Sequence, residues 1–478
     1  METLNILSQT YSVTIILFVS LFFLLLGINY SRKFLDLDNY LLAGRSVKTV
    51  SLTSSLIASS LGTWVLFGPA SAATWGGMGA VVGYSLGTAF PMFFLIYLGK
   101  KFRKEYPDSK TLIEVIRLKY GAKLFKLIFL LSFFYMFIFL IAEVTAVSLL
   151  VKYFSGTPLW ITSLIIVICS MIYTLYGGLK VSIFTDKIQF ALFSILIIIS
   201  FSYLIYVNYN HFNINLIMQT KPELFNLNNK LNYTAGLTFF IAVAATNLFH
   251  QGNWQRVYAA KNYRLLKTSL IISFLVIIPI VFLMGFTGII AASINTDVIP
   301  DLAFFSLILK KQNFYISIVL VLLSISLTIS SIDTIINAIS SLIIVDSSKV
   351  LVLKVNLIKF PKTIIFIICA ITFIIASTGL SILYLFLLAD LLCCAAVLSV
   401  FYSFYKKNFN EKVIILSITF GLLAGLLFFP SPDFSKSTLV GTLIPIKYFP
   451  AYIKDSLLFW SFIIATFLPV LFWRLKIK

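Results

Sequence analysis

The sequence predicts an all-α polytopic membrane protein, with residues 1–478 forming one transmembrane domain. Three observations support this fold class. Sixty per cent of the residues are hydrophobic and only 11% are charged, whereas soluble domains carry about 25% charged residues. Apolar runs of roughly 20 residues, the length that crosses a bilayer core, recur along the whole chain. No long polar linker separates these runs, so we exclude a soluble enzyme, a disordered chain and a disulfide scaffold.

Thirteen apolar segments have the length and composition of membrane-spanning helices. The first is interpreted as an extra N-terminal helix, because it lacks the basic start and the small-residue cleavage site of a secretory signal. The last two, within 413–473, are expected to be C-terminal helices. The predicted spans are 11–28, 49–72, 76–99, 124–152, 158–176, 183–208, 233–254, 266–293, 313–345, 363–379, 381–403, 413–429 and 456–473.

The distribution of the 37 lysine and arginine residues predicts the orientation of the chain. Most of them fall in every second loop, and the densest run lies between Lys100 and Lys126. Loops on the cytoplasmic side of a membrane carry an excess of basic residues. We therefore expect a plasma (inner) membrane protein with its N-terminus outside and its C-terminus in the cytoplasm. The net charge of +20 is assigned to these loops and not to nucleic-acid binding.

Residues that would support metal, redox or nucleotide chemistry are few. The chain has two histidines and no GxxxxGK[ST] motif, so ATP-driven transport has no support. No nucleophile and base stand out as a pair, so we expect neither an enzyme nor an organic cofactor. The cysteines lie inside apolar runs, which favours packing over a disulfide or a zinc site. They are Cys169, Cys369, Cys393 and Cys394.

Four carboxylates fall within predicted spans or at their ends, where a charged group is costly unless it faces protein or water. They are Glu143, Asp186, Asp333 and Asp390. Glu143 is compatible with a gate or with a packing hydrogen bond. Asp390 is compatible with binding of a cationic cargo or with a structural pair.

Two polar stretches interrupt otherwise apolar spans. The run from Ser51 to Trp64 places serines on every face of the second span. Its small residues are consistent with close helix packing or with an unwound stretch that exposes carbonyl groups to an ion. In the ninth span, Ser330, Asp333 and Thr334 share one face, because residues three and four apart are neighbours on a helix. Their oxygens suit a hard cation such as sodium, although such hydroxyls also bond to carbonyls of their own helix.

Several motifs resemble those of the solute:sodium symporter family. The segment Tyr173–Leu179 (YTLYGGL), followed by Thr185–Gln189 (TDKIQ), is similar to a hallmark of that family. Three more segments resemble its entry, ion-site and loop motifs, and the resemblance covers about 40–410 in the same order. These segments are 42–46 (LAGRS), 329–334 (ISSIDT) and 255–261 (QRVYAAK).

The resemblance implies a LeuT-like fold, in which two inverted repeats of five helices are flanked by further helices. The repeats would lie near 49–208 and 233–403, with 11–28 before them. The cargo would bind at mid-membrane, where the first span of each repeat, 49–72 or 233–254, breaks.

The resemblance also implies two ion sites and a set of cargo contacts. The main sodium site would use the backbone carbonyls of Ala58, Leu61 and Leu327 and the hydroxyls of Ser330 and Ser331. A possible second sodium site would use Asp186, Ser330, Asp333 and Thr334, and the alternative is an ion pair of Asp186 with Lys187 or Arg256. The cargo would contact Ser59, Ser60, Thr63 and Trp64 at one break and Asn247, His250 and Gln251 at the other.

We therefore expect a sodium-coupled secondary symporter that imports a small polar organic solute. The segment 106–121 is similar to the urea and polyamine branch of the family, whereas 62–68 is similar to the proline branch. The cargo class thus stays open between a proline-like amino acid, urea and a polyamine. The alternative function is a membrane sensory module that acts with a separate signalling partner. Neither the oligomeric state nor the number of sodium ions follows from the sequence.

Overall fold

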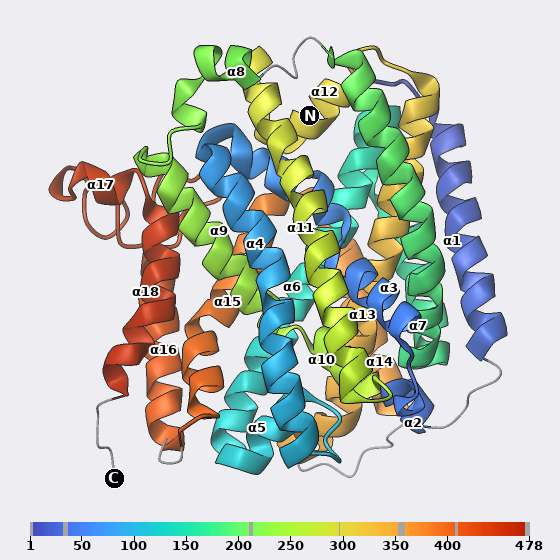
Figure 1. Cartoon of the computed structure of the whole chain (residues 1–478), viewed down its shortest axis with the longest axis vertical. Coiled ribbons are helices and arrows are strands. Elements are labelled where there is room, and N and C mark those ends of the chain that lie inside the picture. The colour runs from blue at the N-terminus through green and yellow to red at the C-terminus, as the bar shows by residue number, and fades with distance from the viewer. Residues whose placement is uncertain are drawn as a thin grey trace.

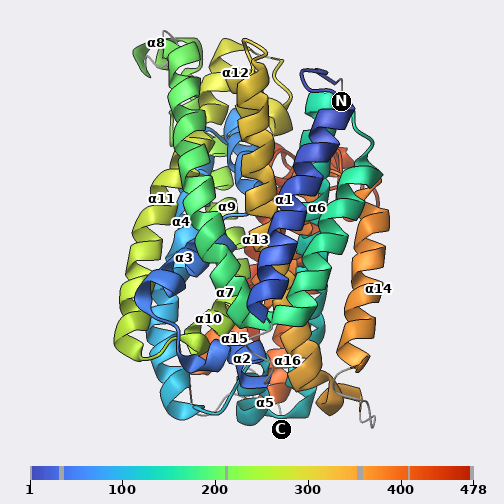
Figure 2. The ribbon, with the colours of Figure 1, turned by 90° about the vertical axis from the view of Figure 1, so that its right-hand side faces the viewer.

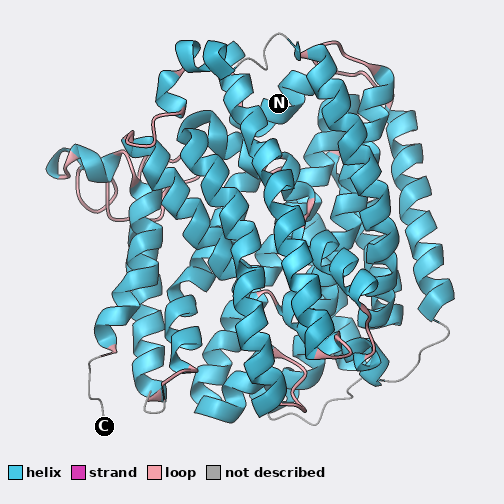
Figure 3. Cartoon of the chain, viewed as in Figure 1, coloured by secondary structure: helices cyan, strands magenta, loops and turns pink. Residues whose placement is uncertain are grey.

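The structure is a computed structural model that describes residues 3–31, 37–209, 214–295, 297–351, 359–406 and 410–473. Within these ranges the chain folds into helices and connecting loops and contains no β-strand, as Figure 3 shows. The predicted all-α class is therefore confirmed. The helices run between two ends of a bundle (Figure 1).

The helices follow one another along the chain with short connections. In order they are α1 (Gln9–Ser31), α2 (Leu37–Leu42), α3 (Thr49–Ser60), α4 (Gly68–Glu105), α5 (Leu112–Tyr120), α6 (Ala122–Ser155), α7 (Leu159–Val207), α8 (Ile214–Thr220), α9 (Lys230–Phe249), α10 (Gln251–Ala259), α11 (Tyr263–Ile294), α12 (Ala303–Ile308), α13 (Phe314–Leu351), α14 (Lys359–Ala376), α15 (Ile382–Ser403), α16 (Glu411–Phe428), α17 (Ala451–Lys454) and α18 (Leu457–Phe472).

Nine helices in the described ranges are long and apolar enough to cross a membrane, and two shorter apolar helices accompany them. Two of the long helices bend sharply at a glycine with positive φ. These are α4 at Gly77 (φ 53°) and α7 at Gly178 (φ 59°). A side chain at either position would be strained, because only glycine adopts this backbone conformation readily. The predicted count of thirteen spans stays a prediction.

Two of the predicted spans are interrupted in the middle of the bundle. The helix α3 ends at Ser60, and the backbone is extended at Leu61 (φ −109°, ψ 93°) and Gly62 (φ −92°, ψ −174°). One 3₁₀ turn, η2 (Thr63–Leu66), then leads into α4. The helix α9 ends at Phe249, and His250 (φ −61°, ψ 106°) separates it from α10. Both interruptions fall in the spans that the resemblance implies to be broken. The boundaries of the two repeats stay a prediction.

The broken helices lie inside a wall of long helices. The helix α4 packs along α9 and α11, while α13 packs against α6 and α7. In Figure 1, α1 lies at the outside of α7, and α16 and α18 form the opposite edge; Figure 2 views the bundle from the side of α1. A side chain on Gly79 would overlap the backbone of Asn232, so α4 and α9 approach to backbone contact. Such small-residue contacts are typical of membrane helices, which gain little from the hydrophobic effect against one another.

Candidate ion and cargo site

A carboxylate from α6 stabilises the interruption after α3 by accepting a backbone hydrogen bond. Glu143 is fully buried, and its Oε2 accepts a hydrogen bond from the backbone amide of Thr63 at 2.9 Å. In a continuous helix this amide would bond to the carbonyl of Ser59. A Cβ at position 62 would lie 2.7 Å from Glu143 Cδ, so any residue other than glycine would force the carboxyl group to shift. Of the two roles expected for Glu143, the geometry therefore shows the packing hydrogen bond.

Two of the predicted main sodium ligands meet at this interruption. The amide of Val65 donates to the carbonyl of Gly62 at 3.2 Å, so the carbonyl of Leu61 loses its regular helical partner. Ser331 Oγ, on α13, lies 2.6 Å from the point that a Cβ of Gly62 would occupy. Leu61 is thus the chain neighbour of Gly62, and Ser331 approaches Gly62 from α13.

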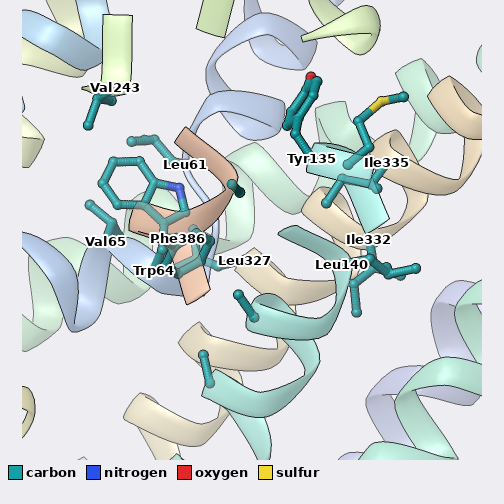
Figure 4. Close-up of a cluster of buried hydrophobic side chains, with 14 of the residues drawn as sticks. Leu61, Trp64, Val65, Tyr135, Leu140, Val243, Leu327, Ile332, Ile335 and Phe386 are labelled. Carbon is teal, nitrogen blue, oxygen red and sulfur yellow. The ribbon is translucent and has the colours of Figure 1, made fainter. Parts of the chain in front are cut away.

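The other predicted main-site residues lie close by. Ala58 is in the last turn of α3, and Leu327 and Ser330 are on α13 beside it. Leu61 and Leu327 belong to the buried hydrophobic cluster drawn in Figure 4. Ser330 Oγ donates a hydrogen bond to Asp186 Oδ1 at 2.6 Å, so it is engaged towards α7 in this conformer.

The four residues of the predicted second sodium site also come together, but a guanidinium lies among them. Arg256 Nη2 donates to Asp186 Oδ2 at 2.7 Å and to Thr334 Oγ1 at 2.9 Å. Arg256 and Asp186 are both fully buried. Ser55 bridges the pair, because it donates to Asp186 Oδ2 at 2.5 Å and accepts from Arg256 Nε at 2.7 Å. The ion pair between Asp186 and Arg256, one of the alternatives for Asp186, is therefore formed.

The second carboxylate of this cluster is surrounded by hydroxyl groups. Asp333 Oδ2 accepts hydrogen bonds from Tyr173 (2.8 Å) and Thr185 (3.2 Å), and Oδ1 accepts one from Ser182 (2.9 Å). Thr334 Oγ1 adds a longer contact to Oδ1 at 3.3 Å. Hydrogen bonds to a buried carboxylate offset part of its desolvation cost. Three of these hydroxyls come from α7, where they lie in or between the hallmark segments.

A small cavity of about 30 Å³ lies between the two helix interruptions. This volume is too small for an organic solute, so the cavity must widen before a cargo can bind. The cavity is bounded by α3, η2, α4, α6, α9 and α15. Its lining consists of Ser59, Ser60, Trp64, Tyr84, Phe139, Val243, Thr246, Asn247, His250, Phe386 and Asp390.

Five of the seven predicted cargo residues line this cavity, and two do not. Thr63 Oγ1 points to α13, where it bonds to Thr328 and to the carbonyl of Ser324. Gln251 accepts a hydrogen bond from the amide of Leu112 at 3.2 Å, away from the cavity and towards α5. Thr63 and Gln251 thus point away from the cavity, and their contact with the cargo stays a prediction. The backbone turns at each interruption, and this reverses the direction of neighbouring side chains.

Asp390 is the lining residue with the strongest electrostatic effect. Only 5% of its surface is exposed, and Thr246 donates a hydrogen bond to its Oδ1 at 2.6 Å. No ion pair involves Asp390 in the part of the chain that the structure describes. The structural pair that was one option for Asp390 is therefore a hydrogen bond to a neutral hydroxyl.

Aromatic rings separate this cavity from a larger one towards α12. The larger cavity has a volume of about 470 Å³ and reaches Trp75 and Asp301. The ring of Trp75 lies 5.8 Å from that of Phe239, which stacks on Tyr84 at 4.5 Å, and Tyr84 stacks on Trp64 at 5.8 Å. Because Tyr84 and Trp64 line the small cavity, these four rings form a continuous barrier between the two spaces.

Hydrogen bonds at the start of α5 join this helix to α13 and α10. Thr111, the N-cap of α5, donates a hydrogen bond to Asp346 Oδ2 on α13 at 2.8 Å. The amide of Leu112 is bonded to Gln251 on α10, and Leu112 is buried. We call these contacts of Thr111 and Leu112 the α5 latch. The α5 latch thus ties α5 to α13 and to α10, whose first residue, Gln251, follows the cavity residue His250.

Comparison with known proteins identifies the kind of protein that has this arrangement. The profile of the "Sodium:solute symporter family" matches residues 40–421. Among curated proteins, the "Spermidine transporter DUR31" of Candida albicans is 24% identical over 305 residues, covering 63% of this chain and 57% of that protein. "Sodium/glucose cotransporter 4" of Mus musculus is 26% identical over 187 residues, covering 38% of this chain and 27% of its own length. The chain thus spans little more than half, or less, of the curated relatives it matches.

Solved structures show the same fold. A Na+-coupled sialic acid symporter in a substrate-bound, outward-open state superposes with a TM-score of 0.72 and 17% identity, covering 97% of this chain and 96% of that one. Mhp1, a nucleobase-cation-symport-1 family transporter in a closed conformation, gives a TM-score of 0.54 and 12% identity over 92% of this chain and 95% of its own. The bundle with two interrupted helices is therefore a transporter fold.

Proposed function

We propose that this chain, which belongs to the sodium:solute symporter family, imports a small organic solute bearing a cationic nitrogen and drives the import with sodium. The observation that carries the cargo class is Asp390, a buried carboxylate on the wall of the central cavity. A buried charge is costly unless it is paired. Because no cationic partner comes from the described part of the chain, a cationic cargo supplies the missing charge.

The remaining lining residues suit the same cargo. Ser59, Ser60 and Asn247 offer oxygen acceptors to the hydrogens of an ammonium group. Trp64 presents an aromatic ring, and a cation over such a ring is stabilised by about 0.5–2 kcal/mol. Amines of this kind are protonated at neutral pH, as the lysine side chain is.

A relative supports the same choice among the three cargo classes. The curated relative from Candida albicans is named as a spermidine transporter, and spermidine is a polyamine. Urea carries no net charge and would leave Asp390 unpaired. A proline-like amino acid would bring a carboxylate into the same cavity, where it would repel Asp390. We therefore favour a polyamine-like or other amine cargo.

The proposed main sodium site is the one that the motifs predict. It consists of the carbonyls of Ala58, Leu61 and Leu327 and the hydroxyls of Ser330 and Ser331. The freed carbonyl of Leu61 and the position of Ser331 beside Gly62 support it. The sodium ion would join the interruption of α3 to α13, so that its binding and release change how these two elements pack.

The energy available from one sodium ion is sufficient for accumulation of the cargo. A charge that crosses 100 mV gains about 2.3 kcal/mol, and a tenfold sodium gradient adds about 1.4 kcal/mol. Together these correspond to several hundred-fold accumulation of a neutral solute. A cargo with one positive charge gains about 2.3 kcal/mol more, directly from the membrane potential.

A second sodium ion remains a proposal with a structural condition. Sodium can bind between Asp186 and Thr334 only after the guanidinium of Arg256 has left that position. The sodium ion would then take the place of the positively charged guanidinium of Arg256 beside Asp186. A Hill coefficient above one for sodium-dependent uptake would support this exchange, and a coefficient of one would assign Arg256 as the permanent counter-ion.

Uptake into proteoliposomes tests the cargo class. Spermidine, proline and urea are offered as labelled solutes under an inward sodium gradient and under a matched potassium gradient. We expect sodium-dependent uptake of spermidine and little of urea. Asp390→Asn should weaken the apparent affinity for spermidine by roughly 10- to 100-fold, since hydrogen bonds to charged groups contribute about 1.5–3 kcal/mol.

The control is Asp433→Asn, which changes an exposed carboxylate that bonds only to the neighbouring residues Ser431 and Ser435. Equal spermidine uptake by wild type and Asp390→Asn would refute the role of Asp390. Uptake that is the same in sodium and potassium would refute sodium coupling.

A further inference from the structure

One carboxylate oxygen of Glu143 lies beside the proposed sodium ligands and accepts no hydrogen bond within the described part of the chain. Glu143 Oε2 is bonded to the amide of Thr63, whereas Oε1 is buried and has no hydrogen-bond partner within the described part of the chain. An unpartnered charged oxygen in a buried site is costly, and such an atom calls for an explanation. Neither the motifs nor the sodium ligands implied by them include Glu143.

The position of Oε1 can be related to Ser331 through Gly62. A Cβ on Gly62 would lie 2.6 Å from Ser331 Oγ and closer still to Glu143 Oε1. The two oxygens are therefore less than twice 2.6 Å apart. Hard cations of this size hold oxygen ligands at about 2.3–2.6 Å, as calcium does, so one ion can touch both oxygens.

The surroundings of Gly62 provide the remaining ligands. The carbonyl of Leu61 has lost its helical partner and lies next to Gly62 in the chain. The side-chain oxygens of Glu143 and Ser331 approach the point that a Cβ of Gly62 would occupy, and glycine leaves room for them there. Carbonyl, hydroxyl and carboxylate oxygens are the ligand types that hard cations prefer.

We propose that Glu143 is a direct ligand of the transported sodium ion, and that the ion bridges α6 to Ser331 on α13 across Gly62. This inference deepens the proposed function and rests on it. The carboxylate balances the charge of the sodium ion, so the loaded site is neutral within the membrane. Glu143 thus has two roles that belong to different oxygens, since Oε2 holds the interruption of α3 and Oε1 binds the ion.

The variant Glu143→Gln separates these roles. The glutamine carbonyl still accepts the hydrogen bond from Thr63, so the interruption is kept, but the charge on the other oxygen is lost. Sodium binding is measured without cargo, as the sodium-dependent rise in the unfolding midpoint of purified protein at constant ionic strength with potassium. We expect Glu143→Gln to raise the sodium concentration for half-maximal stabilisation by roughly tenfold or more.

Two further measurements make the outcome decisive. Glu223→Gln, a control carboxylate paired with Lys221 at the surface, should leave sodium binding unchanged. The unfolding midpoint in potassium alone should be similar for wild type and Glu143→Gln, which shows that the variant is folded. Wild-type affinity for sodium in Glu143→Gln would overturn the inference and leave Glu143 with its structural bond alone. Absence of sodium stabilisation in the wild-type protein would instead refute the proposed sodium coupling itself.

Discussion

Replacement of Gly62 by alanine tests how the interruption of α3 creates the ion site. The new Cβ would lie 2.7 Å from Glu143 Cδ and 2.6 Å from Ser331 Oγ. Carbon atoms pack at about 3.5–4.0 Å, so the carboxyl group must retreat by about 0.8 Å or more. The hydrogen bond from Thr63 to Glu143, now 2.9 Å long, would then be lost.

The size of the effect follows from this hydrogen bond. A hydrogen bond to a charged group contributes about 1.5–3 kcal/mol. If sodium binding requires the carboxylate position that this bond fixes, its loss corresponds to a roughly 10- to 100-fold weaker affinity for sodium. We therefore expect Gly62→Ala to weaken sodium binding by this factor. The backbone at Gly62 has an ordinary negative φ of −92°, so the substitution itself introduces no backbone strain.

The assay is sodium-dependent thermal stabilisation, followed by initial rates of uptake at increasing sodium. Gly285→Ala is the matched control, because its Cβ would meet only Val81 at 3.3 Å or more, on the contact between α4 and α11. Sodium affinity of Gly62→Ala within twofold of wild type would refute the reasoning. Such a result would mean that sodium still binds when the methyl group introduced by Gly62→Ala fills the position proposed for the ion.

Four further predictions follow from other parts of the structure. Ser331→Ala should raise the sodium concentration for half-maximal uptake tenfold or more by removal of a ligand hydroxyl, and unchanged sodium dependence would place the site elsewhere. Thr111→Val should open the α5 latch, measured as faster hydrogen exchange of α5, whereas Thr268→Val, at an exposed helix position, should have no effect. Burial raises the pKa of Asp301, so the folded protein binds the proton of this carboxyl group more tightly than the unfolded chain does. The free energy of unfolding therefore falls as the pH rises from about 4. Asp301→Asn should reduce that fall, which is measured by thermal unfolding at pH 4.5 and 7. A tag before Met1 should be accessible from outside and a reporter after the C-terminus should be cytoplasmic, and finding both on one side would remove a span from the count.

The sequence predicts the fold class and the places where helices break better than it predicts side-chain directions. Serines on every face of 51–64 indicate that this span cannot be a lipid-facing helix, and it is indeed interrupted at Leu61. The direction of Thr63 and Gln251 depends on the backbone angles at the interruptions. No periodic pattern describes those angles, so the sequence does not show that Thr63 contacts α13 and that Gln251 contacts α5.

Long-range pairing explains why other site residues were missed. Arg256 and Asp186 are 70 positions apart; the sequence leaves open whether Asp186 pairs with Lys187 or Arg256 or binds an ion, and the folded structure shows the pair with Arg256. Tyr84 and Thr246 carry no signal in the sequence, since each is one polar or aromatic residue in an apolar span. Asp390 had a signal as an intramembrane carboxylate, but its lack of a cationic partner became evident only from its surroundings.

The close approach of α4 to its neighbours limits how the central cavity can open. Side chains added at Gly79 or Gly83 would overlap the backbone of α9, and one at Gly288 of α11 would overlap Ala70 of α4. Interfaces with this little clearance resist sliding, so we expect α4, α9 and α11 to move together.

The flexible boundary is therefore the one between this body and α6 with α15. Phe139 of α6 and Phe386 of α15 lie on the far side of the cavity, with their rings 4.7 Å apart. The hydrogen bond between Thr246 of α9 and Asp390 of α15 crosses the boundary. A cargo ammonium that binds Asp390 competes with Thr246 for the carboxylate, so loading the carrier would weaken the bond that keeps the two bodies together.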